Sequence, residues 1–118
     1  MTTHGSVIDL DTLNEMKDTM GAEFVGELID AYCQETPQLI AALQKALAQG
    51  QANDFQHAAH SIKSTSASLG ALQFSAAARE LEMVGRGSSL EGVAPAVERL
   101  VADYEQVQSC LQEWRREG

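Results

Sequence analysis

Two histidines and a lysine lie together in one segment of the chain that lacks acids. The stretch DFQHAAHSIKSTSASLGALQF, residues 54–74, holds His57, His60 and Lys63, and it contains two of the three histidines of the chain. Residues 55–79 contain no Asp or Glu, although the chain has 17 acids among 118 residues. A neutral imidazole is a nucleophile, and a neighbouring ammonium attracts a phosphoryl group that a carboxylate would repel. This combination predicts covalent phosphorylation of a histidine.

The helical period places His60 on the outer side of its helix. At about 100° per residue, Phe55, Ile62 and Leu69 fall about 180–220° away from His60. These large apolar side chains are spaced by seven residues and are expected to face the core. We therefore expect His60 to point towards solvent.

The side chains on the same face as His60 are mostly small. Within about 60° of it lie Gln56, His57, Lys63, Ser64, Ala67 and Ala71. An exposed helix face usually carries long Glu, Lys and Gln side chains. Here a shallow floor of Ser and Ala would let the surface of another protein approach the imidazole closely, so these residues are candidates for partner binding.

The residues alone leave two other interpretations of this face open. His57 and His60 are three residues apart and could share a metal ion, although residues 55–79 supply no carboxylate or cysteine as a third ligand. The Ala and Ser side chains could instead pack against a partner helix in a structural or assembly protein. Asp54 lies about 120° round the helix from His60, too far to orient it as in a serine-hydrolase triad. No glycine-rich phosphate loop, HExxH or CxxC motif is present, so nothing indicates an autonomous enzyme.

Every long segment around this face has the apolar spacing of a helix. Asp9 or Asp11 is the possible N-cap of the first helix, Pro37 either kinks or divides the second, and Asn53 and Ser88 begin capping-box patterns. The expected helices span residues 8–20, 22–49, 53–69, 71–85 and about 90–116. Short loops between them favour an all-α fold, an antiparallel four-helix bundle with an additional short N-terminal helix.

Composition and charge narrow the class of protein. The length predicts a single domain over residues 1–118, with a core of aliphatic side chains because aromatics make up only 5%. A formal charge of −9 argues against binding nucleic acid or anionic membranes. No apolar run is long enough to span a membrane, and the N-terminus does not read as a signal peptide. Cys33 and Cys110 are expected to be thiols of a cytoplasmic protein.

The segment AHSIKSTSASLGALQF followed by ARELE, residues 59–82, resembles the signature of histidine-phosphotransfer (HPt) domains of phosphorelays. That family's pattern is roughly A-H-x-L-K-G-S/A-x-x-x-x-G-A followed by a helix that ends in L-E. The resemblance places the phosphorylated histidine at His60, the lysine at Lys63 and the L-E pair at Leu81 and Glu82. The chain departs from the pattern at Ser64, where the family usually has glycine. The order of helices is also similar over nearly the whole chain.

The resemblance implies a phosphorelay protein of two-component signalling without kinase activity of its own. It would accept a phosphoryl group on His60, on the Nε2 atom, from an aspartate of one receiver domain and pass it to another receiver. Lys63 would stabilise the phosphoryl charge, while Ser64, Ala67 and Ala71 would form the docking floor and His57 its rim. The expected partners are response-regulator receiver domains or a hybrid sensor kinase. No cofactor of its own is expected, because the receiver supplies Mg²⁺, and the chain is expected to be a monomer. The alternative is a helical scaffold that docks a kinase or receiver without being phosphorylated.

Overall fold

The computed structural model describes residues 7–117. This part of the chain contains five α-helices joined by short loops, and no strand. The helices are α2 (Leu10–Met20), α3 (Ala22–Gln49), α4 (Ala52–Ser68), α5 (Leu72–Arg86) and α6 (Ala94–Glu117). The prediction of an all-α fold is confirmed. Cys33 and Cys110 are thiols, also as predicted.

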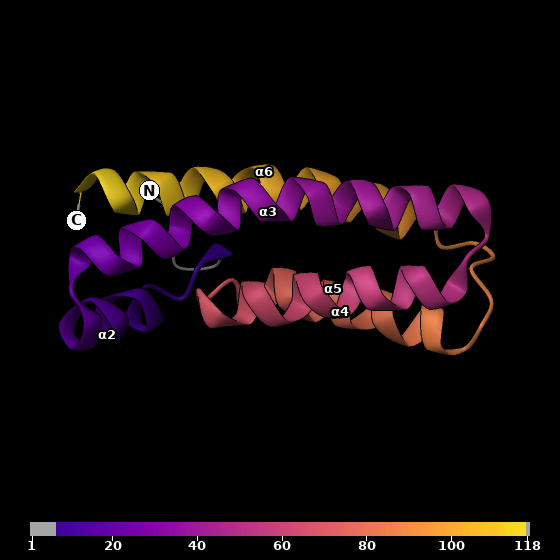
Figure 1. Ribbon diagram of the computed structural model, residues 1–118, viewed down its shortest axis with the longest axis horizontal. Coiled ribbons are helices and arrows are strands. Elements are labelled where there is room, and N and C mark those ends of the chain that lie inside the picture. The colour runs from indigo at the N-terminus through magenta and orange to yellow at the C-terminus, as the bar shows by residue number, and fades with distance from the viewer. Residues whose placement is uncertain (1–6, 118) are drawn as a thin grey trace.

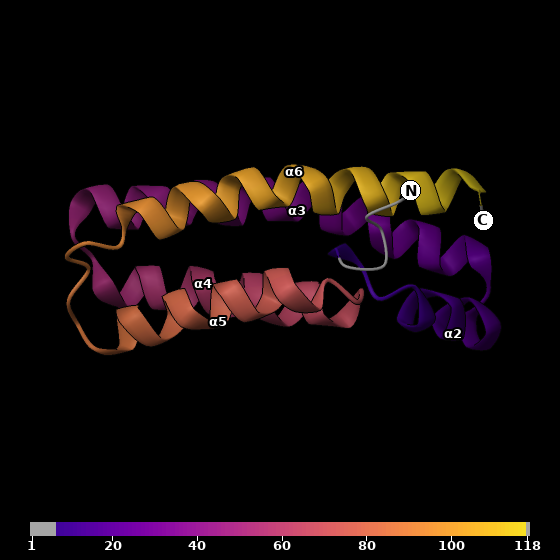
Figure 2. The same cartoon turned by 180° about the vertical axis from the view of Figure 1, so that it is seen from behind.

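The four long helices lie side by side in two layers. Figures 1 and 2 show α3 and α6 in one layer and α4 and α5 in the other, with consecutive long helices running in opposite directions. Each long helix packs against two others: α3 and α5 both contact α4 and α6. The short helix α2 packs against α3 at one end of the molecule (Figure 1).

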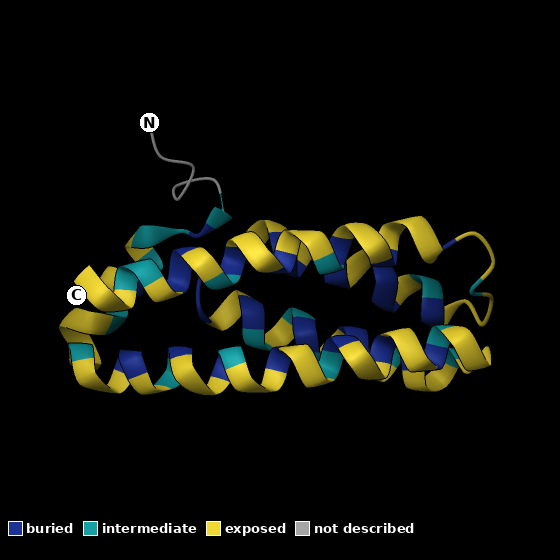
Figure 3. Cartoon of the chain, turned by 90° about the horizontal axis from the view of Figure 1, so that it is seen from above, coloured by how far each residue is buried: buried dark blue, intermediate teal, exposed yellow. Residues whose placement is uncertain are grey.

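The core lies between the two layers and is built from one face of each helix (Figure 3). On α4, Phe55 and Ile62 are fully buried and Leu69, just past the helix end, is 4% exposed. Figure 3 shows buried positions recurring along the inner sides of the helices and exposed positions covering the outside. The predicted apolar face of α4 is therefore confirmed, and the opposite face of this helix is left to solvent.

Some predicted helix boundaries are wrong. Helix α4 begins at Ala52 after Gln51, without a side-chain cap, so the capping box expected at Asn53 does not form. Helix α6 begins at Ala94, about four residues later than expected. Ser88 adopts a left-handed φ of 68° there, which turns the chain instead of capping a helix, and Pro95 then occupies the first turn of α6, where its missing N–H costs little. Helix α3 continues without a break through Pro37.

The turn between α4 and α5 is fixed to the start of α2. Gly70 has a φ of +84°, a region that favours glycine, and its carbonyl accepts a hydrogen bond from the Asp9 backbone N–H at 2.8 Å. A Cβ at Gly70 would lie 2.9 Å from the Asp9 carbonyl oxygen. This contact holds in place the ends of the two helices that carry the candidate site.

Candidate functional site

Helix α5 turns a row of mostly small side chains towards α4. Ser75, Ala78, Glu82 and Gly85 follow one another at three- and four-residue steps, which puts them on one face of the helix. The Ser75 hydroxyl donates a hydrogen bond to the carbonyl oxygen of Lys63 at 2.8 Å, and Ala78 is completely buried. Small residues let the two backbones approach closely. Glu82 is the one long side chain in this row, and it is only 4% exposed.

The buried carboxylate of Glu82 joins three side chains around one point. Its Oε2 atom lies 2.8 Å from Nδ1 of His60, and its Oε1 accepts a hydrogen bond from Nζ of Lys63 at 2.7 Å. The guanidinium of Arg86 approaches Oε2 more loosely, at 3.5 Å. The imidazole of His60 is itself 56% exposed. The site therefore consists of an exposed histidine whose ring is oriented by a hydrogen bond to a buried acid.

The charge state of Glu82 determines which nitrogen of His60 can react. The hydrogen bond from Lys63 holds the pKa of Glu82 below its ordinary value of 4.5, against the opposing effect of burial, and the hydrogen bond with His60 lowers it further. The carboxylate is therefore ionised at neutral pH and can only accept hydrogen bonds. The proton of a neutral imidazole then sits on Nδ1, and the lone pair available for reaction sits on Nε2.

The predicted floor of small residues is shorter than the sequence suggested. His57, Ser64 and Ala67 are exposed, and Gln56 is half-buried. Ala71, however, is 0% exposed, so a partner cannot touch it and its predicted docking role is wrong. The angular argument fails for Ala71 because α4 ends at Ser68 and the chain then turns.

The expectation that acids stay away from His60 was also incomplete. Residues 55–79 contribute no carboxylate, but the neighbouring helix brings Glu82 into contact with His60. The resemblance includes Glu82 in the L-E pair without predicting a contact for it, and the sequence pattern predicts no role for Arg86. The signal that could have found Glu82 is its position as a lone acid in the row of small residues Ser75, Ala78 and Gly85.

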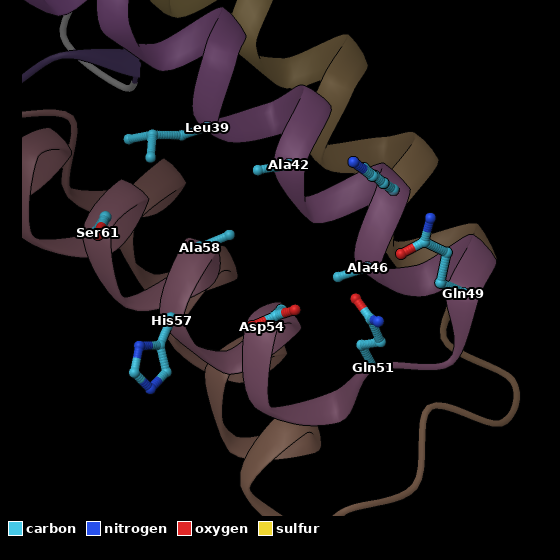
Figure 4. A pocket seen from close by; sticks show the side chains of 10 residues that line it. Leu39, Ala42, Ala46, Gln49, Gln51, Asp54, His57, Ala58 and Ser61 are labelled. Carbon is cyan, nitrogen blue, oxygen red and sulfur yellow. The ribbon is translucent and has the colours of Figure 1, made fainter.

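Two hollows share His57 and Ser61 on the outer side of α4. One, of about 320 Å³, lies beside the imidazole and is lined by Gln56, His57, His60, Ser61, Glu82 and Arg86. A larger one, of about 590 Å³, lies between α3 and α4, where Figure 4 shows Ala42, Ala46 and Ala58 around it and His57 at its margin. The hollow beside His60 is lined by Arg86 and not by Lys63, whose ammonium is held by Glu82. Arg86 is thus the cation nearest to the free space at the imidazole.

The described residues offer little support for a metal site. Within residues 7–117, no group of three or more His, Cys, Asp or Glu side chains is arranged to hold a metal ion, so the pair His57 and His60 has no third ligand there. In the same part of the chain, no helix is both long and apolar enough to cross a membrane.

Solved structures share this arrangement of helices. Histidine-containing phosphotransfer protein B from Pseudomonas aeruginosa PAO1 is 24% identical with a TM-score of 0.88, and the match covers 95% of this chain and 96% of that one. The HPT domain of a sensor hybrid histidine kinase from Shewanella is 20% identical with a TM-score of 0.71, covering 92% and 90% of the two chains. At these identities the likeness shows a common fold. No curated protein matches the sequence.

The sequence itself supplies the link to a family. The sequence model of the Hpt domain family matches residues 27–110, a range that includes His60, Lys63, Glu82 and Arg86. This range covers most of the chain and contains the exposed histidine with its buried acid. The chain therefore belongs to the Hpt domain family, the phosphotransfer proteins of phosphorelays.

Proposed function

We propose that His60 accepts a phosphoryl group from a receiver-domain aspartate and passes it to the aspartate of a second receiver. The hydrogen bond between Glu82 and Nδ1 of His60 carries this proposal, because it directs the lone pair of an exposed imidazole to Nε2. An exposed nucleophile with a buried orienting acid is suited to meeting a phosphoryl group on another protein.

The transfer involves one bond formed and one broken. Nε2 of His60 attacks the phosphorus, the N–P bond forms, and the bond from phosphorus to the aspartyl oxygen breaks, which releases the receiver's carboxylate. The proton stays on Nδ1, so the imidazole ring gains positive charge during attack. The ionised Glu82, 2.8 Å away, stabilises that charge. The second receiver reverses the same steps, and Mg²⁺ belongs to the receiver.

The two cations at the site take different parts in this proposal. Lys63 keeps Glu82 ionised through its hydrogen bond and contributes positive charge beside the imidazole. Arg86 lines the hollow next to His60, where its guanidinium can meet phosphoryl oxygens. The exposed side chains of Ser64 and Ala67 leave room for the receiver to approach. The helices form an antiparallel four-helix bundle that acts as a monomer and has no kinase activity of its own.

Transfer of an acid-labile label from a phosphorylated receiver tests the proposal. Wild type is expected to acquire the label, His60→Gln to remain unlabelled, and His57→Gln, the matched control, to be labelled like wild type. Incubation with ATP alone is expected to give no label. A wild-type protein that no receiver can label, or a His60→Gln variant that is still labelled, would refute the assignment.

A further inference from the structure

Helices α4 and α5 approach each other very closely at Gly85. A Cβ at this position would lie 2.9 Å from the backbone nitrogen of Gln56 and 3.0 Å from its Cα. Ordinary van der Waals contact begins at 3.4 Å, so even a methyl group fits only if the backbones move apart. Gly85 lies within α5, where glycine is a poorer helix former than alanine. Its presence is explained by this contact and not by the needs of the helix.

The close contact adjoins the site directly. Gln56 and His60 are one helical turn apart on α4, and Glu82 and Gly85 are almost one turn apart on α5. Because the two helices run in opposite directions, the contact of Gly85 with Gln56 lies next to the hydrogen bond of Glu82 with His60. The distance between the helices at Gly85 therefore sets how far the carboxylate must reach.

We propose that Gly85 is a positioning residue for phosphotransfer, whose missing side chain sets the helix spacing at which Glu82 holds His60. The inference rests on the proposed function of His60. Relieving a contact of 2.9 Å to 3.4 Å requires a movement of about 0.5 Å. The same movement would lengthen the hydrogen bond of Glu82 with His60 from 2.8 Å to about 3.3 Å, where it is weak.

Lys63 is tied to α5 independently of Gly85. The hydroxyl of Ser75, nearer the start of α5, donates to the carbonyl oxygen of Lys63 at 2.8 Å. Widening of the helix pair at Gly85 should therefore act on the bond of Glu82 with His60 more than on the bond with Lys63. We therefore expect Gly85→Ala to weaken the hydrogen bond that keeps the proton on Nδ1 of His60, while Glu82 stays ionised.

The substitution Gly85→Ala tests this role, with Gly87→Ala as the matched control. Gly87 ends the same helix with an ordinary φ of −77°, and a Cβ there would have its nearest neighbour at 3.4 Å. The ¹⁵N shifts of the His60 ring report which nitrogen carries the proton, without any phosphate. Gly85→Ala is expected to weaken the preference for the proton on Nδ1 and to slow transfer about three- to tenfold. Gly87→Ala is expected to change neither.

A second background shows whether Gly85 acts through Glu82. In the Glu82→Ala background, Gly85→Ala should slow transfer by less than about twofold further, because the contact it disturbs is already absent. Wild-type ring shifts and rate in Gly85→Ala, or an equal loss in both backgrounds, would overturn the inference. The inference would also be overturned if Gly85→Ala unfolds while Gly87→Ala stays folded, because Gly85 would then be needed for the fold as a whole. If wild type is never labelled at His60, the proposed function fails, whereas the ring shifts still test Gly85.

Discussion

Removing the charge of Glu82 while keeping its shape is the most direct probe of the site. In Glu82→Gln, the amide oxygen can still accept a hydrogen bond from Nδ1 of His60, so the ring orientation should survive. What disappears is the negative charge that faces the imidazole at 2.8 Å and the ammonium of Lys63 at 2.7 Å. The variant therefore separates the electrostatic contribution of Glu82 from its geometric one.

The size of the effect follows from the kind of hydrogen bond that is lost. A hydrogen bond to a charged group contributes about 1.5–3 kcal/mol and a neutral one about 0.5–1.5 kcal/mol. The difference of about 1–1.5 kcal/mol applies to the transition state, in which the ring of His60 becomes positive, and predicts transfer about five- to thirteenfold slower. The free energy of unfolding should fall by about 1 kcal/mol, because the side chain of Lys63 is 28% exposed and solvent screens part of its charge.

Rapid-quench measurement of transfer from a saturating phosphorylated receiver gives the relevant rate constant. Glu80→Gln is the matched control, because Glu80 is an exposed acid two residues away on the same helix. It changes the net charge of the protein by the same amount and should leave the rate unchanged. A Glu82→Ala variant, which also loses the acceptor for Nδ1, should be slower than Glu82→Gln.

Two outcomes would refute this reasoning. A Glu82→Gln variant that transfers at the wild-type rate would show that the carboxylate does not stabilise charge on the imidazole. Equal slowing by Glu80→Gln would show that the effect comes from the overall charge of the protein and its encounter with the receiver, and not from the contact with His60.

Three further predictions concern acid stability, the second cation and the core. Because the pKa of Glu82 is lowered, its ionised form stabilises the fold above pH 4.5, and this stabilisation is lost as the pH falls below that value. The difference in unfolding free energy between wild type and Glu82→Gln should therefore shrink when denaturation is measured at decreasing pH below 4.5. Arg86→Ala should slow transfer about two- to fivefold, and it should change Tm little because the Arg86 side chain is 67% exposed. Lys63→Ala should slow transfer as well, and in addition it should raise the pKa of Glu82 in an NMR titration, because the hydrogen bond from Lys63 is what lowers that pKa most. Burial raises the pKa of Tyr32 to about 12, so its phenol stays protonated, 2.7 Å from the Ser66 hydroxyl. Ser66→Ala removes this buried hydrogen bond and should lower the free energy of unfolding by about 1–2 kcal/mol in chemical denaturation, without slowing transfer.

Periodicity predicted the features that belong to one helix. Phe55, Ile62 and Leu69 are buried and His60 is exposed, as the 100° step requires, because side-chain direction within a helix depends on the backbone alone. The same reasoning failed where a helix ends. Ala71 falls on the exposed face by its angle, yet it is buried. It lies in the turn between α4 and α5, where the chain is no longer helical and the 100° step does not apply.

Contacts between helices depend on register, which periodicity within one helix does not contain. His60 and Glu82 are 22 residues apart, and their contact requires the turn at Gly70, the small side chains of Ser75 and Ala78 and the close approach at Gly85. The acid gap of residues 55–79 was interpreted as clearance for a phosphoryl group, and this interpretation needs one change. An acid can lie beneath the imidazole because Lys63 and Arg86 outnumber it, two cations to one carboxylate. The electrostatic requirement is therefore a site whose anion, Glu82, is buried, paired with cations and turned towards Nδ1, while Nε2 is left to the incoming phosphoryl group.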